Sequence, residues 1–496
     1  MTNALRSAPV RGSRRVLRVA ARAATATALV VSATVVGFSV SSDDGGRTVE
    51  ALENATIGAG GEYHALTPDR ILDTRDPNLD VPPGGRKPTA SVAGDATFDV
   101  QIVGRGGLPG FVDNNHDCAD DNVLAVAVNV TVVAPTGDGW MQAFGKGANA
   151  GTSSLINFKP NEVVPNTALL RPGCDGKLTL RLYTGAVAGS ADVVIDVFGW
   201  ISSSSYSVRG ARLQPVGPGR IFDSREAPYG ATPFAGGQQK FVQIRGATSY
   251  NPTIADIVPA NATGVLLNVT AVDNIPGSQP TYISLLPSPL TGGELPKTSN
   301  LNLRVGQIRA NLAIVPISAD GGVWVYNHAG NAHVILDVMG YFVPRADDTT
   351  VGRGFPLVSP FRAFDTREAA FADQPLPPAN AEDWSFQDFA NDVKINGQPL
   401  DVGQIGLLGN LTAAALGRQY SWAPSSSYVT AYATPAGGGA HSPPLISNLN
   451  IAEGEIVPNL VMLSYGSDGT DPYQVRFYNR AGYLDYLLDV TAVILA

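Results

Sequence analysis

The chain has 496 residues, of which 44% are hydrophobic and 16% are charged, and its formal net charge is −9. One hydrophobic core serves roughly 250–300 residues at most, so the length predicts about two to four domains. The hydrophobicity excludes general disorder. The acidity argues against a nucleic-acid partner, because an acidic surface repels phosphate backbones.

The N-terminal segment has the pattern of a secretory signal. Residues 1–41 contain six arginines and no acidic residue, and residues 23–40 form an uncharged apolar run. A basic stretch followed by such a run and by small residues predicts a signal peptide, so we expect a secreted or cell-surface protein. The alternative is an uncleaved N-terminal membrane anchor, since a run of about 18 residues is just long enough to span a bilayer.

Five sequence landmarks then recur three times in the same order. They are an Arg-x-x-Asp-[Thr/Ser]-Arg opening (70–75, 220–225, 362–367), an Asn-x-Thr run (Asn129, Asn268, Asn410), a Ser-x-x-Asn segment (Asn157, Asn302, Asn450), an asparagine nine residues later (Asn166, Asn311, Asn459) and an apolar close with one acid (Asp196, Asp337, Asp489). Such repetition marks copies of one folding unit. We place the modules at 62–202, 211–343 and 355–496, and the short polar linkers favour modules that touch.

Within a module the hydrophobic runs alternate as β-strands do. Val126, Val128, Val130 and Val132 are separated by small or polar residues, which is the period of two expected for a strand with one face in a core. Asp-Gly pairs in front of later runs mark tight turns. About eight short strands in each module predict an all-β protein of three tandem β-sandwich, jelly-roll-like modules.

Each closing run places one carboxylate among apolar residues, where an unpaired charge is costly. The cations present in every module are the arginines of the opening motif. We therefore predict structural ion pairs in which an arginine holds the acid bidentately and clamps the first strand to the last. The predicted pairs are Arg75 with Asp196, Arg225 with Asp337, and Arg367 with Asp489. The alternative is a carboxylate active site that uses Asp73 with Asp196.

The asparagines of the Asn-x-Thr runs form glycosylation sequons, but a position within a strand is a poor glycan acceptor. We expect the amides of Asn129, Asn268 and Asn410 to satisfy backbone groups inside their own modules.

The remaining candidate sites occur in single modules. Cys118 and Cys174 are the two cysteines, and an even count in an exported chain predicts a disulfide. Trp140 and Trp422 lie in loop-like contexts, where an indole ring can stack on a sugar. An acidic loop offers oxygen ligands for calcium at Asp113, Asp117, Asp120 and Asp121, but it lacks EF-hand spacing. A solvated loop is the simpler interpretation, and no cofactor is expected.

A resemblance to a known family is carried by the opening motif, the Asn-Val-Thr run, the Ser-Asn-Leu-Asn-type run and the closing Asp-Val-x-Gly-[Tyr/Trp]. These motifs resemble those of a secreted β-module of actinobacterial and other bacterial surface proteins, which stands in tandem or is attached to units such as peptidoglycan hydrolases. The resemblance covers nearly all of residues 62–496, and residues 103–109 look like the Gly-rich segment of the family. Copy 3 departs from the pattern, because Thr491 and Ala492 replace the Gly-aromatic pair. The resemblance implies an extracellular accessory role and no catalytic residue.

We therefore expect a secreted or cell-surface structural or adhesive protein that is not an enzyme. The first alternative is a carbohydrate-binding protein that recognises a cell-wall glycan, and the second is an extracellular hydrolase. The expected partners are a cell-wall polysaccharide or another surface protein. A membrane contact is expected only if the N-terminal segment is uncleaved.

Overall fold

The computed structural model of the protein describes residues 13–15, 49–51, 61–76, 95–111, 122–185, 189–203, 206–250, 252–346, 351–368, 374–395, 398–399, 403–417, 423–439 and 441–496. Strands dominate these residues, which include one short α-helix, α1 (Gln387–Asp392), and one 3-10 turn, η1 (Ala227–Tyr229). Among the described residues no helix is long and apolar enough to cross a membrane.

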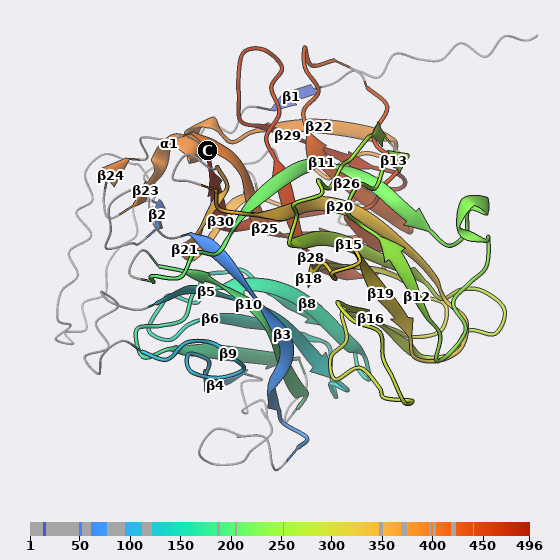
Figure 1. Cartoon of the computed structure of the whole chain (residues 1–496). Coiled ribbons are helices and arrows are strands. Elements are labelled where there is room, and N and C mark those ends of the chain that lie inside the picture. Colours follow the sequence, from blue (N-terminus) through green and yellow to red (C-terminus); the bar gives the residue numbers. More distant parts are fainter. Residues whose placement is uncertain are drawn as a thin grey trace, which may run out of the picture.

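Module 1 is a two-layer β-sandwich (Figure 1). The strand order of its inner sheet is β8 (Val163–Leu170), β5 (Val123–Val133), β10 (Asp192–Ser202) and β3 (Glu62–Asp73); that of its outer sheet is β4 (Asp95–Gln101), β9 (Lys177–Thr184), β6 (Gly139–Gly145) and β7 (Ile156–Phe158). Val126, Val128 and Val130 of β5 share one core with Leu180 and Leu182 of β9. The predicted alternation thus places the valines between the two sheets.

Module 2 repeats this strand order. Its inner sheet is β18 (Ile308–Pro316), β15 (Gly264–Val272), β20 (His333–Pro344) and β11 (Ala211–Asp223), and its outer sheet is β12 (Gln239–Gln243), β19 (Gly322–Asn327), β16 (Thr281–Leu286) and β17 (Leu301–Leu303). A small hairpin of β13 (Ser249–Tyr250) and β14 (Thr253–Ile254) is added.

Module 3 has the same plan. Its inner sheet is β28 (Ile456–Ser464), β25 (Gln404–Ala414), β30 (Asp485–Leu495) and β21 (Arg353–Asp365), and its outer sheet is β22 (Asn380–Ser385), β29 (Gln474–Asn479), β26 (Ser427–Ala433) and β27 (Leu449–Ile451). Short additions are β1 (Ser13–Arg15) beside β22, and a sheet of β2 (Val49–Ala51), β23 (Val393–Ile395) and β24 (Gln398–Pro399). The prediction of an all-β protein built from three tandem β-sandwich modules is confirmed.

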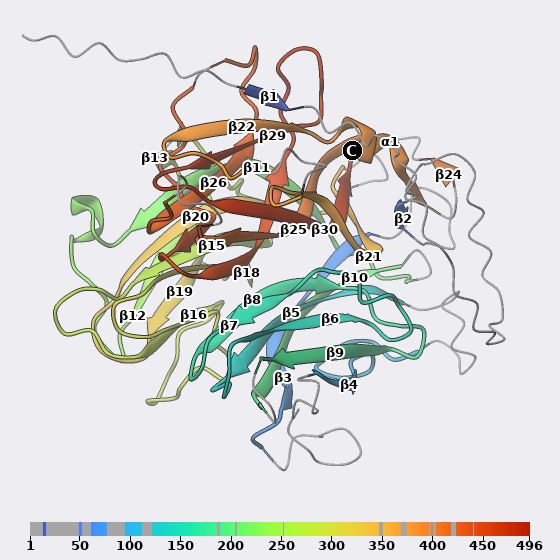
Figure 2. The same ribbon diagram turned by 180° about the vertical axis from the view of Figure 1, so that it is seen from behind.

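The three modules are grouped around a common centre and do not form a row (Figure 2). Strands β8, β18 and β28 each lie at one edge of an inner sheet, and we call them the inner-edge strands. They contact one another in pairs. The edge strands β7, β17 and β27 of the outer sheets each contact the next module in cyclic order: β7 contacts β28, β27 contacts β18, and β17 contacts β8. The modules therefore surround a pseudo-threefold axis. In addition, Tyr63 of β3 pairs with Ala211 of β11, which joins two inner sheets into one sheet of eight strands.

This arrangement buries both faces of the inner sheets. In β5, Val126 and Val128 face the core of module 1, while Ala125 and Ala127 belong to a second core that also holds Leu266 of module 2. Most of that second core comes from module 3. The small residues between the valines of β5 therefore contact neighbouring modules.

Candidate functional site

The opening motif and the closing strand of each module meet in a chain of four charged side chains. In module 2, Arg220 lies opposite Asp337 and binds it bidentately, with Nε–Oδ1 and Nη2–Oδ2 distances of 2.8 and 3.3 Å. Nη1 of Arg220 also donates to Asp223 at 3.3 Å. Asp223 accepts two more bonds from the guanidinium of Arg225, at 2.9 and 2.6 Å. We call this four-residue chain the clamp.

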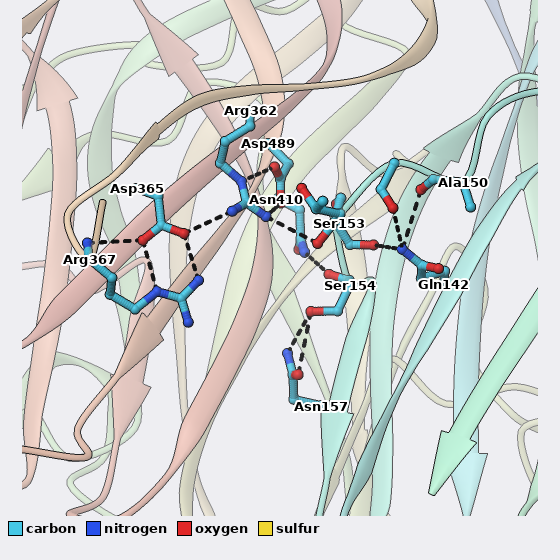
Figure 3. A network of polar contacts seen from close by, with 12 residues as sticks. Gln142, Ala150, Ser153, Ser154, Asn157, Arg362, Asp365, Arg367, Asn410 and Asp489 are labelled. Atoms are coloured by element: carbon cyan, nitrogen blue, oxygen red, sulfur yellow. Dashed lines mark hydrogen bonds and ion pairs between the residues drawn. The ribbon is translucent and has the colours of Figure 1, made fainter. Parts of the chain in front are cut away.

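Modules 1 and 3 contain the same clamp. In module 3, Arg362 joins Asp489 to Asp365, and Arg367 binds the other side of Asp365 (Figure 3). Arg362 also donates to the backbone oxygen of Thr152 in module 1, 3.4 Å away, so this clamp touches its neighbour. The equivalent residues of module 1 are Arg75, Asp73, Arg70 and Asp196.

The structure corrects the predicted partner of each closing acid. The predicted pairs Arg75–Asp196, Arg225–Asp337 and Arg367–Asp489 are replaced by Arg70–Asp196, Arg220–Asp337 and Arg362–Asp489. The reason is that β11 ends at Asp223 and a turn follows it. Arg225 folds back over this turn, and its backbone N–H donates to Asp223 Oδ1 at 3.0 Å. The second arginine of each motif therefore binds the aspartate two residues before it.

The clamp holds its carboxylates as ion pairs. Burial raises the pKa of Asp223, but the hydrogen bonds and charges of Arg225 and Arg220 outweigh burial and hold the pKa below its usual value. A general acid needs a raised pKa, and a nucleophile needs a free lone pair. Burial is the largest influence on the pKa of Asp337 and raises it, yet this side chain is fully buried and out of reach of a substrate. The geometry therefore favours the structural role.

A ring of buried asparagines links the three modules. Asn166, Asn311 and Asn459 each accept, at Oδ1, a backbone hydrogen bond from another module. The donors are Leu460 at 3.2 Å, Thr167 at 3.2 Å and Leu312 at 3.0 Å, respectively. Module 1 donates to module 2, module 2 to module 3, and module 3 to module 1, so the ring is closed. The three side chains are at most 1% exposed.

The asparagines of the Asn-x-Thr runs form an outer layer of this ring. Oδ1 of Asn129 accepts from Asn311, Oδ1 of Asn268 from Asn459, and Oδ1 of Asn410 from Asn166, at 3.3, 2.9 and 2.9 Å. Their Nδ2 groups donate to the backbone oxygens of Ser299, Ser447 and Ser154 in the same neighbouring modules. The prediction that these amides act inside their own modules is therefore wrong. They lie on the face of the inner sheet that turns away from the module core.

A cavity of about 490 Å³ lies on the pseudo-threefold axis beside the ring. All three modules line it. Its wall includes Pro165, Ala310 and Pro458, which directly precede the ring asparagines in the sequence. We call this space the axial cavity, and it is the candidate binding site.

Polar contacts between modules surround the axial cavity. Arg304 of module 2 binds Glu162 of module 1 at 2.5 Å, and Arg309 of module 2 binds Glu455 of module 3 at 2.7 Å. Lys159 of module 1 donates to the backbone oxygen of Gly454 at 2.9 Å. Burial raises the pKa of Glu455, but Arg309 outweighs burial and lowers it below the usual value. Glu455 therefore does not have the environment of a hydrolase general acid.

One wall of the axial cavity is aromatic and belongs to module 1. Trp140 of β6 and Tyr183 of β9 line the cavity and stack with their ring centroids 5.2 Å apart and their planes at 17°. The guanidinium of Arg181 lies 5.5 Å from the Trp140 ring centroid. The prediction placed Trp140 in a loop as a stacking residue; the structure instead places it, half-buried, in strand β6 at the cavity wall.

Several predicted sites lie outside the described residues. They are Trp422, Cys118 and the acidic-loop residues Asp113, Asp117, Asp120 and Asp121. The disulfide with Cys174 and the calcium alternative therefore stay predictions.

The charged rim of the axial cavity was not predicted from the sequence, nor were its partners. Lys159, Arg304 and Ala452 occupy equivalent places two residues after the recurring asparagines Asn157, Asn302 and Asn450. This loop follows a landmark in each copy, which was the available signal. Its partners lie on other modules, so no spacing within a copy could reveal them.

Comparisons with known proteins add no family. No protein-family model matches the chain, and no curated protein matches it. Among solved structures, the CBM22-1-CBM22-2 tandem domain of Paenibacillus barcinonensis Xyn10C is 13% identical, covering 56% of this chain and 99% of its own, with a TM-score of 0.15. A triple jelly-roll protein of an archaeal virus is 9% identical, covering 88% and 91%, with a TM-score of 0.15. Scores this low support no conclusion about function.

Proposed function

We propose that this chain is a secreted or cell-surface structural or adhesive protein that works as one rigid body and performs no catalysis. The closed asparagine ring is the observation that carries the proposal. It joins residues of all three modules through buried hydrogen bonds, which fix the modules relative to one another. Buried amide networks of this kind specify one arrangement, because each amide both donates and accepts.

The use of the recurring polar residues also supports a structural role. The acids of the opening motifs, Asp73, Asp223 and Asp365, each contact two arginines of the clamp. The asparagines of the Asn-x-Thr runs and of the ring bond to neighbouring modules. The opening motif, the closing acid and two of the three recurring asparagine positions therefore hold strands or modules together.

The surface location is tested by expressing the full chain with a C-terminal tag in an actinobacterial host. We expect protease added to intact cells to remove the tag while a cytoplasmic marker protein survives. Mass spectrometry of the exported chain should find a new N-terminus near residue 42, as the signal pattern predicts. A tag that stays protected inside intact cells would contradict the proposal.

The absence of catalysis is tested on purified peptidoglycan and other cell-wall polysaccharides. We expect no release of soluble fragments by the purified chain. Release that disappears in Asp73→Asn would instead support the carboxylate active site and overturn the proposal.

A further inference from the structure

We propose that the axial cavity binds a neutral saccharide of two or three sugar units, with Trp140 and Tyr183 as its stacking platform. The inference deepens the proposed function, which supplies the extracellular setting in which such a glycan would be met. The size of the cavity, its charge balance and the position of its aromatic rings all suit such a ligand.

The size of the axial cavity suits a small glycan. Ligand sites in proteins commonly have volumes of roughly 300–1,000 Å³, and this cavity has about 490 Å³. Because residues of all three modules line it, the site exists only when the modules are assembled. The buried asparagine ring beside it makes the wall a preformed one, which reduces the entropy lost on binding.

The charges of the axial cavity favour a neutral ligand. Its lining contains three acids and three bases, which are Asp138, Glu162, Glu455, Lys159, Arg304 and Arg309. Arg304 and Arg309 are each bound to a glutamate, and Lys159 to a backbone oxygen. The lining therefore has no net charge, which gives an anionic or a cationic ligand no electrostatic advantage. A polyhydroxylated neutral ligand can use the remaining lone pairs and N–H groups of these side chains without breaking their pairs.

The aromatic wall supplies the apolar contact that sugars use. The pyranose ring has an apolar face of C–H groups that packs on an indole or phenol ring. The stacking between Trp140 and Tyr183 fixes the orientation of both rings. Side chains of Asn157, Asn302 and Gln307 in the same lining carry the amide donors and acceptors suited to sugar hydroxyls.

The triplicated chain provides a matched control for Trp140. Trp140 pairs across its sheet with Asn157, and Tyr282 pairs with Asn302 in the equivalent strands of module 2. Tyr282 stacks on His328, with centroids 4.4 Å apart, just as Trp140 stacks on Tyr183. Tyr282 is not among the residues that line the axial cavity. A change at Tyr282 therefore removes an equivalent ring that is not part of the cavity lining, although Tyr282 is the strand neighbour of Asn302.

The test measures binding to the exported chain, residues 42–496, by isothermal titration calorimetry. The probes are chitotriose, maltotriose and xylotriose, with trigalacturonic acid as the charged comparison. We expect saturable binding of at least one neutral trisaccharide and weaker binding of the acidic one. Trp140→Ala should weaken binding about tenfold or more, because it removes the ring contact. Tyr282→Ala should change it less than about twofold.

A conservative variant and a stability measurement separate loss of the ring from loss of the fold. Trp140→Phe retains a ring and should bind between the wild type and Trp140→Ala, and thermal unfolding of each variant shows whether it is folded. The proposal is overturned if no neutral saccharide binds, if the acidic one binds best, or if a folded Trp140→Ala binds as the wild type does. A failure here leaves the surface location intact, because protease accessibility is measured independently.

Discussion

At the scale of single residues, burial decides which arginine of the opening motif matters most. The Arg220 side chain is 11% exposed and faces a closing acid that is fully buried, whereas the Arg225 side chain is 44% exposed. Removing one partner of a buried ion pair leaves a charge with no compensation. Removing the half-exposed Arg225 leaves a buried carboxylate, Asp223, that Arg220 still pairs with.

We therefore expect Arg220→Leu to lower the free energy of unfolding by about 3–5 kcal/mol. Arg225→Leu should cost less, about 1.5–3 kcal/mol, because Asp223 keeps its bond to Arg220. Urea denaturation followed by circular dichroism measures both. Equal losses in the two variants would mean that Arg225 contributes as much to holding the closing acid as Arg220 does.

The sequence predicted an ion-pair clamp between the first and last strands of every module, but not which arginine binds which aspartate. The requirement that a buried acid be paired identified Asp196 and the arginines of the motif. The choice between Arg70 and Arg75 depends on the register of β3 against β10, which shifts at a bulge between Ile195 and Asp196. A bulge of this kind has no sequence signature strong enough to predict its position.

At the scale of elements, the inner-edge strands β8, β18 and β28 make the hydrogen bonds that join the three modules. Each carries one ring asparagine with its side chain on the face away from the module core. The side chain of Asn311, for example, makes three hydrogen bonds: it accepts from Thr167 N–H and donates to Asn129 Oδ1 and to the backbone oxygen of Asn300. Two of these three bonds cross to module 1.

We expect Asn311→Ala to destabilise the protein by about 2–3 kcal/mol, because it leaves buried donors and acceptors unpaired. The amide proton of Thr167 should exchange with solvent faster in this variant. Asn450→Ala is the matched control, since the Asn450 amide bonds to Ser447 Oγ within its own module, and it should cost less than about 1 kcal/mol. Unchanged exchange at Thr167 in Asn311→Ala would contradict a ring that holds the modules.

The sequence could predict these strands but not their contacts between copies. In a triplicated chain, a landmark in one copy has identical candidate partners in all three. Asn129 could pair with the segment near Asn166 or with that near Asn311, and nothing in the spacing separates the two. The axial cavity could not be predicted from the sequence for the same reason, because contacts between copies form it. Its asymmetry comes from substitutions such as Arg309, where the other copies have Val164 and Val457.

At the scale of the whole molecule, the three modules depend on one another. One hydrophobic core contains Phe198 of module 1, Met339 of module 2 and Leu408 of module 3. The asparagine ring and the edge pairing of β3 with β11 add hydrogen bonds between modules. A module removed from this assembly would expose the second face of its inner sheet, so we expect the described body to unfold as one unit.

Unfolding at low pH tests whether the modules unfold together, because every module carries an equivalent titrating aspartate in its opening motif. The pKa values of Asp73, Asp223 and Asp365 are raised by burial but lowered further by their arginines, so each lies below its usual value. A carboxyl group whose pKa is lower in the folded state stabilises the protein above its unfolded pKa of about 3.9 and loses that contribution as the pH falls through its folded pKa. These three groups should therefore lower stability below about pH 4, whereas Asp196 and Asp337, whose pKa values burial raises, act in the opposite direction.

We expect this decline to appear as one transition. Because the clamps are equivalent and the modules share a core, protonation should weaken all three together, and calorimetry between pH 2 and pH 7 should show a single endotherm that moves to lower temperature. Asp223→Asn removes the titrating group of module 2 alone. It should lower the melting temperature at pH 7, with a smaller further loss on acidification than in the wild type. Three separate endotherms at any pH would mean that the modules fold independently and that the shared core and ring contribute little.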